Sequence, residues 1–371
     1  CLIEVSHCEE LVLNAPASKP GLHLTRTKRS MTTGQKAAME GGHLFKKLLV
    51  RWFDASSISV SSKRLKLNHF ISLISVLFLD SMAGHEGEKM TVCVALKVHD
   101  CIVFTADSAT SLTGLDEQGQ QRVVNIYDHA NKVFNLHKGL PIAAMTAGIG
   151  NFGVCSISTI SKDLRALLMD GNSDYEIDTS NYTIEEVATK ARKYLFEDRF
   201  LKLDDKPQGT FQYWISGYSS GQDLGEIWKI QIQNGVCPDP ICEAAREQPQ
   251  MISWGGQTEA INRILLGYGQ GLPEALLTAG LPEPDLAAAM THVASRTQAS
   301  LLNAAMPTRE AIDLAVFLAE TQKQFVRFSI GSNTVGGELD VATVTKHEGF
   351  KWIKRKHYYS RELNPLETDH A

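Results

Sequence analysis

The clearest pattern of apolar and polar positions lies between residues 90 and 110. Residues 92–96 are apolar on both faces of an extended strand, and the polar pair His99-Asp100 follows. Residues 101–106 form a second, mostly apolar run that ends at Asp107. Runs rich in β-branched residues and bounded by a polar turn are typical of strands. The pattern therefore predicts a β-hairpin, and the rest of the chain is expected to be organised around it.

The patterns downstream predict a mixed fold. The expected strands are 123–126, 131–136, 142–146, 210–218, 226–233, 250–254, 339–345 and 350–353, and the expected helices are 151–168, 183–200, 258–268, 284–300 and 308–324. The segment 108–121 is expected to be a polar loop, and Val154 is expected on the buried stripe of the first helix. Strands and helices do not alternate one by one, which argues against a doubly wound parallel sheet. The prediction is an α+β fold of antiparallel sheets covered by helices.

Composition and charge limit the classes of function. The 371 residues are 43% hydrophobic and 21% charged, as in ordinary globular proteins. A formal net charge of −5 gives no reason to expect a nucleic-acid partner. The seven cysteines contain no CxxC pair and the twelve histidines show no ligand spacing, so we expect reduced thiols in a cytoplasmic protein, with no metal and no cofactor. The apolar run 70–79 is too short to span a membrane, which needs about 20 residues.

Residues 1–89 differ in character from the rest. They carry a net charge of +4, against −9 for residues 90–371. Three interpretations stay open: a genuine extension, a propeptide, or upstream sequence translated because the start was misassigned. We favour the third, with Met90 rather than Met82 as the start. The expected organisation is a poorly structured N-terminal extension over 1–89, absent from the mature protein, a single domain over 90–356 and a C-terminal tail over 357–371.

Thr91 stands directly after Met90 and begins the hairpin. A threonine hydroxyl is a poor nucleophile at neutral pH and needs a base within hydrogen-bond reach. A free α-amino group, with an ordinary pKa of about 7.7–8.0, can accept the proton if Thr91 is the first residue. A start methionine before a small residue is normally removed, which makes this arrangement accessible. The ordinary alternative is a β-branched residue that simply begins a strand.

Four positions together resemble the N-terminal-nucleophile hydrolases of the proteasome β-subunit and HslV type. They are Thr91, Asp107 sixteen positions later, Lys132 at the start of Lys-Val-Phe-Asn-Leu, and Gly148 in Thr-Ala-Gly-Ile-Gly. The resemblance implies a four-layer α-β-β-α sandwich of two antiparallel sheets. It implies that Thr91 is the nucleophile, that Lys132 and Asp107 tune it electrostatically, and that the Gly148 N–H forms an oxyanion hole beside a helix N-terminus.

Each of these positions also has an ordinary interpretation. Lys132 could be a solvated strand-edge lysine, as most lysines are. Lys138 is a less well placed candidate for the same role. Gly148 could be a plain turn glycine.

Two segments depart from the pattern of that family. Residues 254–257 stand where a Gly-Ser-Gly turn is expected, and neither Ser253 nor Gln257 is in register to replace its serine. In 331–337, Ser332 replaces an aspartate and Val335 replaces a serine. In that family the aspartate and the serine would orient the α-amine. Because both are replaced here, slow hydrolysis is expected.

The resulting hypothesis is a threonine-type peptidase, or amide hydrolase, that acts on a peptide or protein substrate. The resemblance further implies a homo-oligomeric ring, with or without an ATPase partner, and no nucleic acid or membrane. Two alternatives stay open: a non-catalytic ring or scaffold subunit of the same fold, and an amidase for a small molecule.

Overall fold

The computed structural model describes residues 8–13, 24–29, 91–115, 121–331 and 334–356. The chain divides into two compact units. One comprises Cys1–Phe78 with Gln270–Arg296, and the other comprises Leu79–Gly269 with Thr297–Ala371.

The described residues of the first unit include two strands and two helices. β1 (Cys8–Leu13) and β2 (Leu24–Arg29) pair antiparallel. α6 spans Leu272–Thr278 and α7 spans Glu283–Thr297. α7 corresponds to the helix predicted over 284–300, whereas α6 was not predicted.

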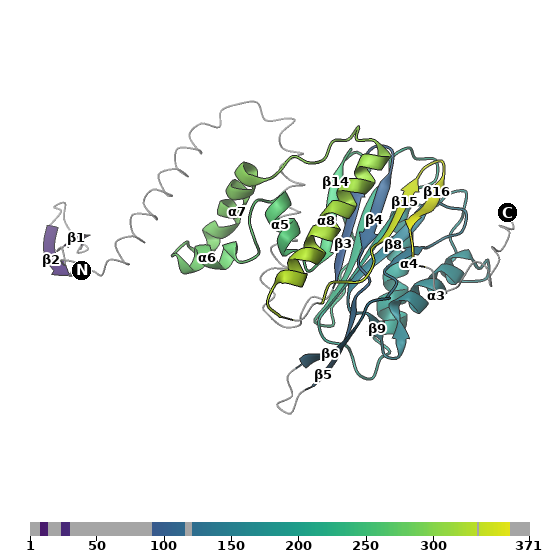
Figure 1. Cartoon of the computed structure of the whole chain (residues 1–371), viewed down its shortest axis with the longest axis horizontal. Coiled ribbons are helices and arrows are strands. Elements are labelled where there is room, and N and C mark those ends of the chain that lie inside the picture. Colours follow the sequence, from purple (N-terminus) through teal and green to yellow (C-terminus); the bar gives the residue numbers. More distant parts are fainter. Residues whose placement is uncertain (1–7, 14–23, 30–90, 116–120, 332–333, 357–371) are drawn as a thin grey trace, which may run out of the picture. The chain divides into compact units, whose positions relative to one another are not determined.

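The second unit is built on two five-stranded antiparallel sheets (Figure 1). The first has the order β14-β3-β4-β15-β16, with bounds Met251–Gly256, Val92–Lys97, Ile102–Ala106, Asp340–Thr345 and Gly349–Lys354. The second has the order β13-β12-β11-β8-β7, with bounds Ile241–Ala244, Glu226–Gln233, Thr210–Gly217, Ile142–Gly148 and Val133–Asn135. The prediction of an α+β fold with antiparallel sheets is confirmed.

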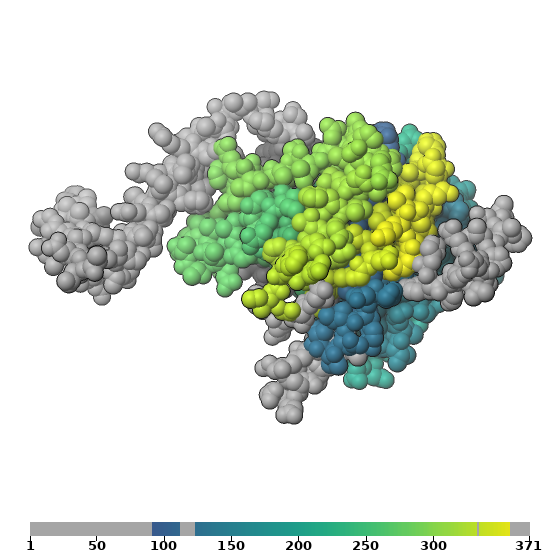
Figure 2. All heavy atoms as spheres, viewed as in Figure 1, coloured from purple at the N-terminus to yellow at the C-terminus, as the bar shows by residue number. Residues whose placement is uncertain are grey.

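Strand β3 is buried on both faces, as its apolar sequence requires. Its odd-numbered side chains Cys93 and Ala95 join a core cluster with Met145 and Trp214 of the second sheet. The opposite face of β3 and β4 is covered by α8 (Thr308–Phe328). Figure 2 shows the yellow-green atoms of α8 as a ridge beside the yellow C-terminal strands.

Helices also cover the outer face of the second sheet. α3 (Ile157–Met169) and α4 (Ile184–Arg192) bury their apolar stripes in a cluster that includes Phe211 and Tyr213 of β11. α4 is capped by Thr183, whose hydroxyl accepts from the Glu186 N–H at 3.1 Å. A π-helix (Lys193–Phe200) continues α4. The short helix α5 (Glu259–Leu265) packs against α8.

The predicted start of the helix over 151–168 is wrong. Two short strands, β9 (Asn151–Phe152) and β10 (Cys155–Ser156), form a hairpin first, and α3 begins at Ile157. Gly153 takes a φ of +57° in this turn, a conformation that glycine adopts without steric cost. Val154, expected on the buried stripe, is therefore fully exposed.

The polar loop predicted over 108–121 is also wrong. β5 (Thr110–Leu115) pairs antiparallel with β6 (Gln121–Tyr127) in a separate hairpin. β6 contains the strand predicted over 123–126, but β5 has the sequence Thr-Ser-Leu-Thr-Gly-Leu and carries little of the apolar alternation that identifies a strand. Pairing between the two backbones supplies the hydrogen bonds instead.

Candidate active site

Thr91 lies just before β3 and is buried. Its carbonyl accepts a hydrogen bond from the Gln257 N–H at 2.7 Å. Gly256, with a φ of +83°, packs so tightly here that a Cβ atom would lie 1.9 Å from the Thr91 carbonyl oxygen. Only glycine allows this approach, so the end of β14 fixes the backbone of Thr91.

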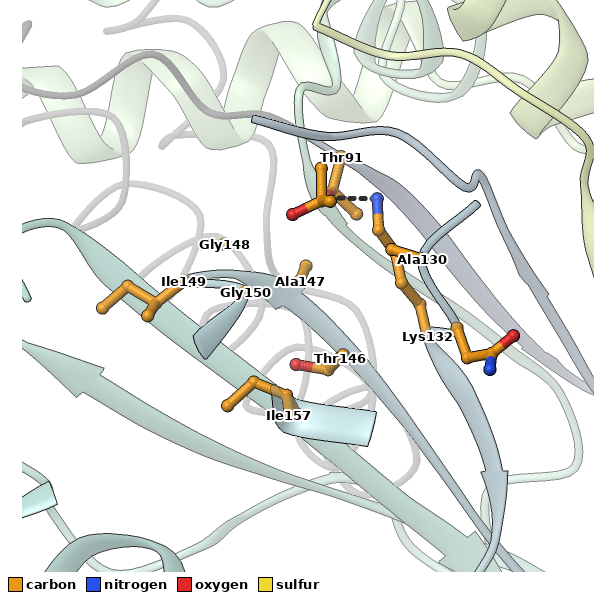
Figure 3. A pocket seen from close by; sticks show the side chains of 11 residues that line it. Thr91, Ala130, Lys132, Thr146, Ala147, Gly148, Ile149, Gly150 and Ile157 are labelled. Atoms are coloured by element: carbon orange, nitrogen blue, oxygen red, sulfur yellow. Dashed lines mark hydrogen bonds between the residues drawn. The ribbon is translucent and has the colours of Figure 1, made fainter. Parts of the chain in front are cut away.

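Lys132 lies just before β7 and points at Thr91 (Figure 3). Its Nζ donates to Thr91 Oγ1 at 2.6 Å and to Asp107 Oδ1 at 2.6 Å. Its side chain is 6% exposed and that of Asp107 is 0% exposed. The ammonium is therefore held inside the protein between the hydroxyl and the carboxylate, and it is not the solvated strand-edge lysine of the ordinary interpretation.

Asp107, directly after β4, receives four hydrogen bonds. Besides Lys132, its donors are the N–H groups of Val92 at 3.1 Å, Ala109 at 3.2 Å and Gly336 at 3.0 Å. An ionised carboxylate accepts and never donates, so this set of donors fits the charged form. Asp107 thereby joins the start of β3, its own loop and the segment before β15.

Gly148 ends β8 and lines the same small pocket as Thr91 and Lys132. The pocket has a volume of about 30 Å³, and Figure 3 shows its wall formed by Thr146, Ala147, Ile149, Gly150 and Ile157. Gly148 has a φ of +84°, and a Cβ atom there would lie 1.9 Å from the Thr210 carbonyl oxygen. This close approach between strands, rather than a plain turn, explains the glycine.

The expected helix beside Gly148 is displaced. Because β9 and β10 intervene, α3 starts nine residues after Gly148, although its first residue, Ile157, still lines the pocket. The effect of a helix dipole at Gly148 therefore has no direct support in the geometry.

The structure brings four predicted site residues together: Thr91, Asp107, Lys132 and Gly148. Lys138 is exposed in the turn after β7 and does not line the pocket.

Cys93, two residues after Thr91, is a competing nucleophile in this region. Burial raises the pKa of its thiol strongly; the nearby Lys132 opposes the rise and Asp107 adds to it. The thiol donates to the Thr146 carbonyl at 2.9 Å. Burial thus keeps the Cys93 thiol protonated and unreactive.

The residues considered for orienting the α-amine differ in their positions and contacts. Ser253 accepts from Trp214 Nε1 at 2.8 Å and bonds Glu243, so it is engaged elsewhere between the sheets. Gln257 lies beside Thr91, and its Nε2 donates to Thr334 Oγ1 at 2.9 Å. Val335 is fully buried, and Ser332 lies outside the described residues.

Sequence reasoning singled out 331–337 but gave no role to Gly336 or Thr334, and it set Gln257 aside as out of register. The contacts of these three residues join segments that are distant in the sequence, so their roles could not be assigned from it. The glycine pairs at 255–256 and 336–337 are the one sequence signal that close backbone packing occurs there.

The chain was compared with family models, with curated proteins and with solved structures. No family model matches the chain, and no curated protein matches it. Among solved structures, the chain resembles the helical assembly of the Anbu complex from Pseudomonas aeruginosa, at 17% sequence identity and a TM-score of 0.42. The match covers 72% of this chain and 89% of that one.

The assignment to the proteasome β-subunit and HslV type is therefore wrong. No family model supports it, and the distant structural similarity is to the Anbu complex instead. The patterns that suggested the assignment are short and local.

The described residues contain neither a candidate metal site nor a candidate membrane-spanning helix. They contain no group of three or more His, Cys, Asp or Glu side chains that could hold a metal ion. None of the helices in this part of the chain is long and apolar enough to cross a membrane.

Proposed function

We propose that this protein hydrolyses amide bonds in peptides with Thr91 as an N-terminal nucleophile. The observation that carries the proposal is the contact of Lys132 Nζ with both Thr91 Oγ1 and Asp107 Oδ1 at 2.6 Å, inside the protein. A buried ammonium beside a hydroxyl favours the ionised alkoxide over the neutral alcohol. The same ammonium would otherwise be costly to bury, and Asp107 compensates its charge.

The proposed reaction begins after removal of Met90. The α-amine of Thr91 accepts the hydroxyl proton, and Oγ1 attacks the substrate carbonyl carbon. The negative charge that develops on the carbonyl oxygen is stabilised by the N–H of Gly148, which lines the same pocket. The protonated amine then gives its proton to the leaving amine of the substrate. An ester to Thr91 remains, and a water molecule activated by the amine hydrolyses it.

The fold expected for this chemistry is a four-layer α-β-β-α sandwich. The packing of α8 on the first sheet and of α3 and α4 on the second supports this layer order. A homo-oligomer and a peptide or protein substrate belong to the proposal, and an ATPase partner stays a prediction. The term helical assembly describes the Anbu structure and not this chain.

A non-catalytic scaffold of the same fold is the second candidate. Val335 favours it, because a buried apolar side chain stands where a hydroxyl was expected to orient the α-amine. An amidase for a small molecule has no comparable observation in its favour.

Turnover of a fluorogenic peptide library separates the two candidates. The proposal expects hydrolysis by the chain that begins at Thr91, loss of it in Thr91→Ala and partial retention in Thr91→Ser. Thermal melts should show that Thr91→Ala still folds. Equal turnover by the wild type and Thr91→Ala would refute the mechanism, and no turnover by either would favour the scaffold.

A further inference from the structure

Another buried lysine, Lys356, lies two residues after β16. Its Nζ lies 2.8 Å from Asp340 Oδ2, and its backbone N–H donates to Asp340 Oδ1 at 3.3 Å. The Nζ also donates to the Ala130 carbonyl at 2.7 Å and to the Ser108 hydroxyl. The ammonium therefore reaches three separate segments of the chain.

Two of these segments carry the proposed active-site residues. Ser108 directly follows Asp107, and Ala130 stands two residues before Lys132. The Ala130 N–H also donates to the Ser108 carbonyl at 2.9 Å. Lys356 thus links the segment of Asp107 to the segment of Lys132.

Ser108 also contacts the segment that leads into β15 and Asp340. The Ser108 N–H donates to the Gly336 carbonyl at 3.0 Å, and the Gly336 N–H donates to Asp107 Oδ2. The Ser108 hydroxyl in turn donates to the Glu338 carbonyl. One residue, Ser108, is therefore held by both the Lys356 ammonium and the backbone that supports the Asp107 carboxylate.

Burial distinguishes this ion pair from its neighbour. The side chains of Lys356 and Asp340 are 5% and 1% exposed, whereas those of Lys354 and Glu338, 3.7 Å apart, are 55% and 65% exposed. Removing two charges from water costs free energy that a well-packed apolar pair would not cost. A buried ion pair is thus a weak way to stabilise the fold. Its effect here is to hold the segments that contact Lys356 in a fixed arrangement.

We propose that the Lys356–Asp340 pair is a positioning element that sets Lys132 Nζ against Thr91 Oγ1. The inference rests on the proposed function. Its physical basis is that a displacement of about 1 Å at a reacting group can cost on the order of 100-fold in rate. Neither side chain touches the substrate; both act through the segments 107–109 and 130–132.

The test uses Lys356→Met and the double variant Lys356→Met/Asp340→Asn. The single variant leaves a buried carboxylate without its partner, so it can fail to fold. The double variant removes that charge and keeps the test valid. Lys229→Met/Glu243→Gln is the matched control, because Lys229 and Glu243 form another buried ion pair, 3.3 Å apart and 4% and 6% exposed, on β12 and β13.

The first readout is the rate at which an amine-acylating reagent modifies Lys132, with exposed Lys138 as the internal reference. We expect modification at least about tenfold faster in folded Lys356→Met/Asp340→Asn and unchanged in Lys229→Met/Glu243→Gln, because only the former loosens the segment of Lys132. An unchanged Lys132 rate in the double variant would overturn the proposal. This readout does not require the protein to be an enzyme.

The second readout is peptide hydrolysis. We expect kcat to fall at least about tenfold in the double variant with KM nearly unchanged, and the pH profile of kcat/KM to move. Wild-type levels of kcat and an unmoved profile would also overturn the positioning role. Absence of Thr91-dependent hydrolysis in the wild type would refute the proposed function and leave the labelling result to decide on Lys356.

Discussion

Lys132 Nζ donates to Thr91 Oγ1 at 2.6 Å, across 41 positions of sequence. The bond joins the strand that begins the hairpin of the first sheet to the edge strand of the second. The proposed nucleophile is therefore built at the contact of two sheets, where a change in their packing would change its chemistry.

Replacing Lys132 by alanine should lower kcat by more than about 100-fold, because a charge arranged for the transition state is lost. Lys138→Ala should change little, since Lys138 is exposed in the turn after β7. Steady-state kinetics on both variants provide the measurement. Similar losses in the two would show that Lys132 is not an electrostatic partner of Thr91.

The chain that begins at Thr91 should react with an electrophile that captures both a hydroxyl and an adjacent amine, such as an epoxyketone. Intact mass establishes whether the protein from its native host begins at Thr91, and peptide mapping locates the adduct. We expect the adduct on the peptide that starts with Thr91, formed slowly because Val335 is apolar, and none in Thr91→Ala. Failure of a confirmed Thr91 terminus to react would support the scaffold.

Gly148→Ala should destabilise the fold by more than about 3 kcal/mol, because the new Cβ would lie 1.9 Å from the Thr210 carbonyl oxygen. Gly139→Ala is the control: Gly139 also has a positive φ, +96°, but a Cβ there meets nothing within 4 Å. Its cost should be only that of the left-handed backbone, about 1–2 kcal/mol. Urea denaturation compares the two, and equal costs would contradict the close strand approach at Gly148.

Cys237 should make stability fall as the pH rises from about 9 to about 11. Burial raises the pKa of its thiol from 9.0 to about 11, with Arg192 opposing the rise. Below pH 9 both states keep the proton, but between these values only the unfolded chain releases it, so alkali favours unfolding. Cys237→Ala should reduce this slope in urea denaturation at several pH values. A slope identical to that of the wild type would show that the thiol titrates alike in both states.

The amino-acid sequence by itself determined the hairpin of β3 and β4. Residues 92–96 and 101–106 are apolar on both faces, so only a strand covered on both sides could bury them. The hairpin fixes the relation of Thr91 to Asp107, because the two residues end adjacent paired strands. The antiparallel α+β class followed from the order of the elements for the same local reasons.

The predictions from sequence were wrong at two places, where a glycine turn and a polar strand determine the local structure. The periodicity over 151–168 continued past Gly153, which the structure uses for the turn between β9 and β10. β5 has little apolar alternation to reveal it, whereas the centre of its partner β6 was predicted as the strand over 123–126. Backbone pairing and turn geometry are not encoded in the apolar pattern.

Only the tertiary structure decided what surrounds the candidate site. The Gly336 N–H reaches Asp107 across 229 positions, and Lys356 reaches Ala130 across 226. Such contacts arise when two sheets pack and a loop closes over their ends, and no periodicity along the chain records them. The sequence could therefore name Thr91, Asp107, Lys132 and Gly148 as candidates, whereas the fold alone placed the groups that hold them.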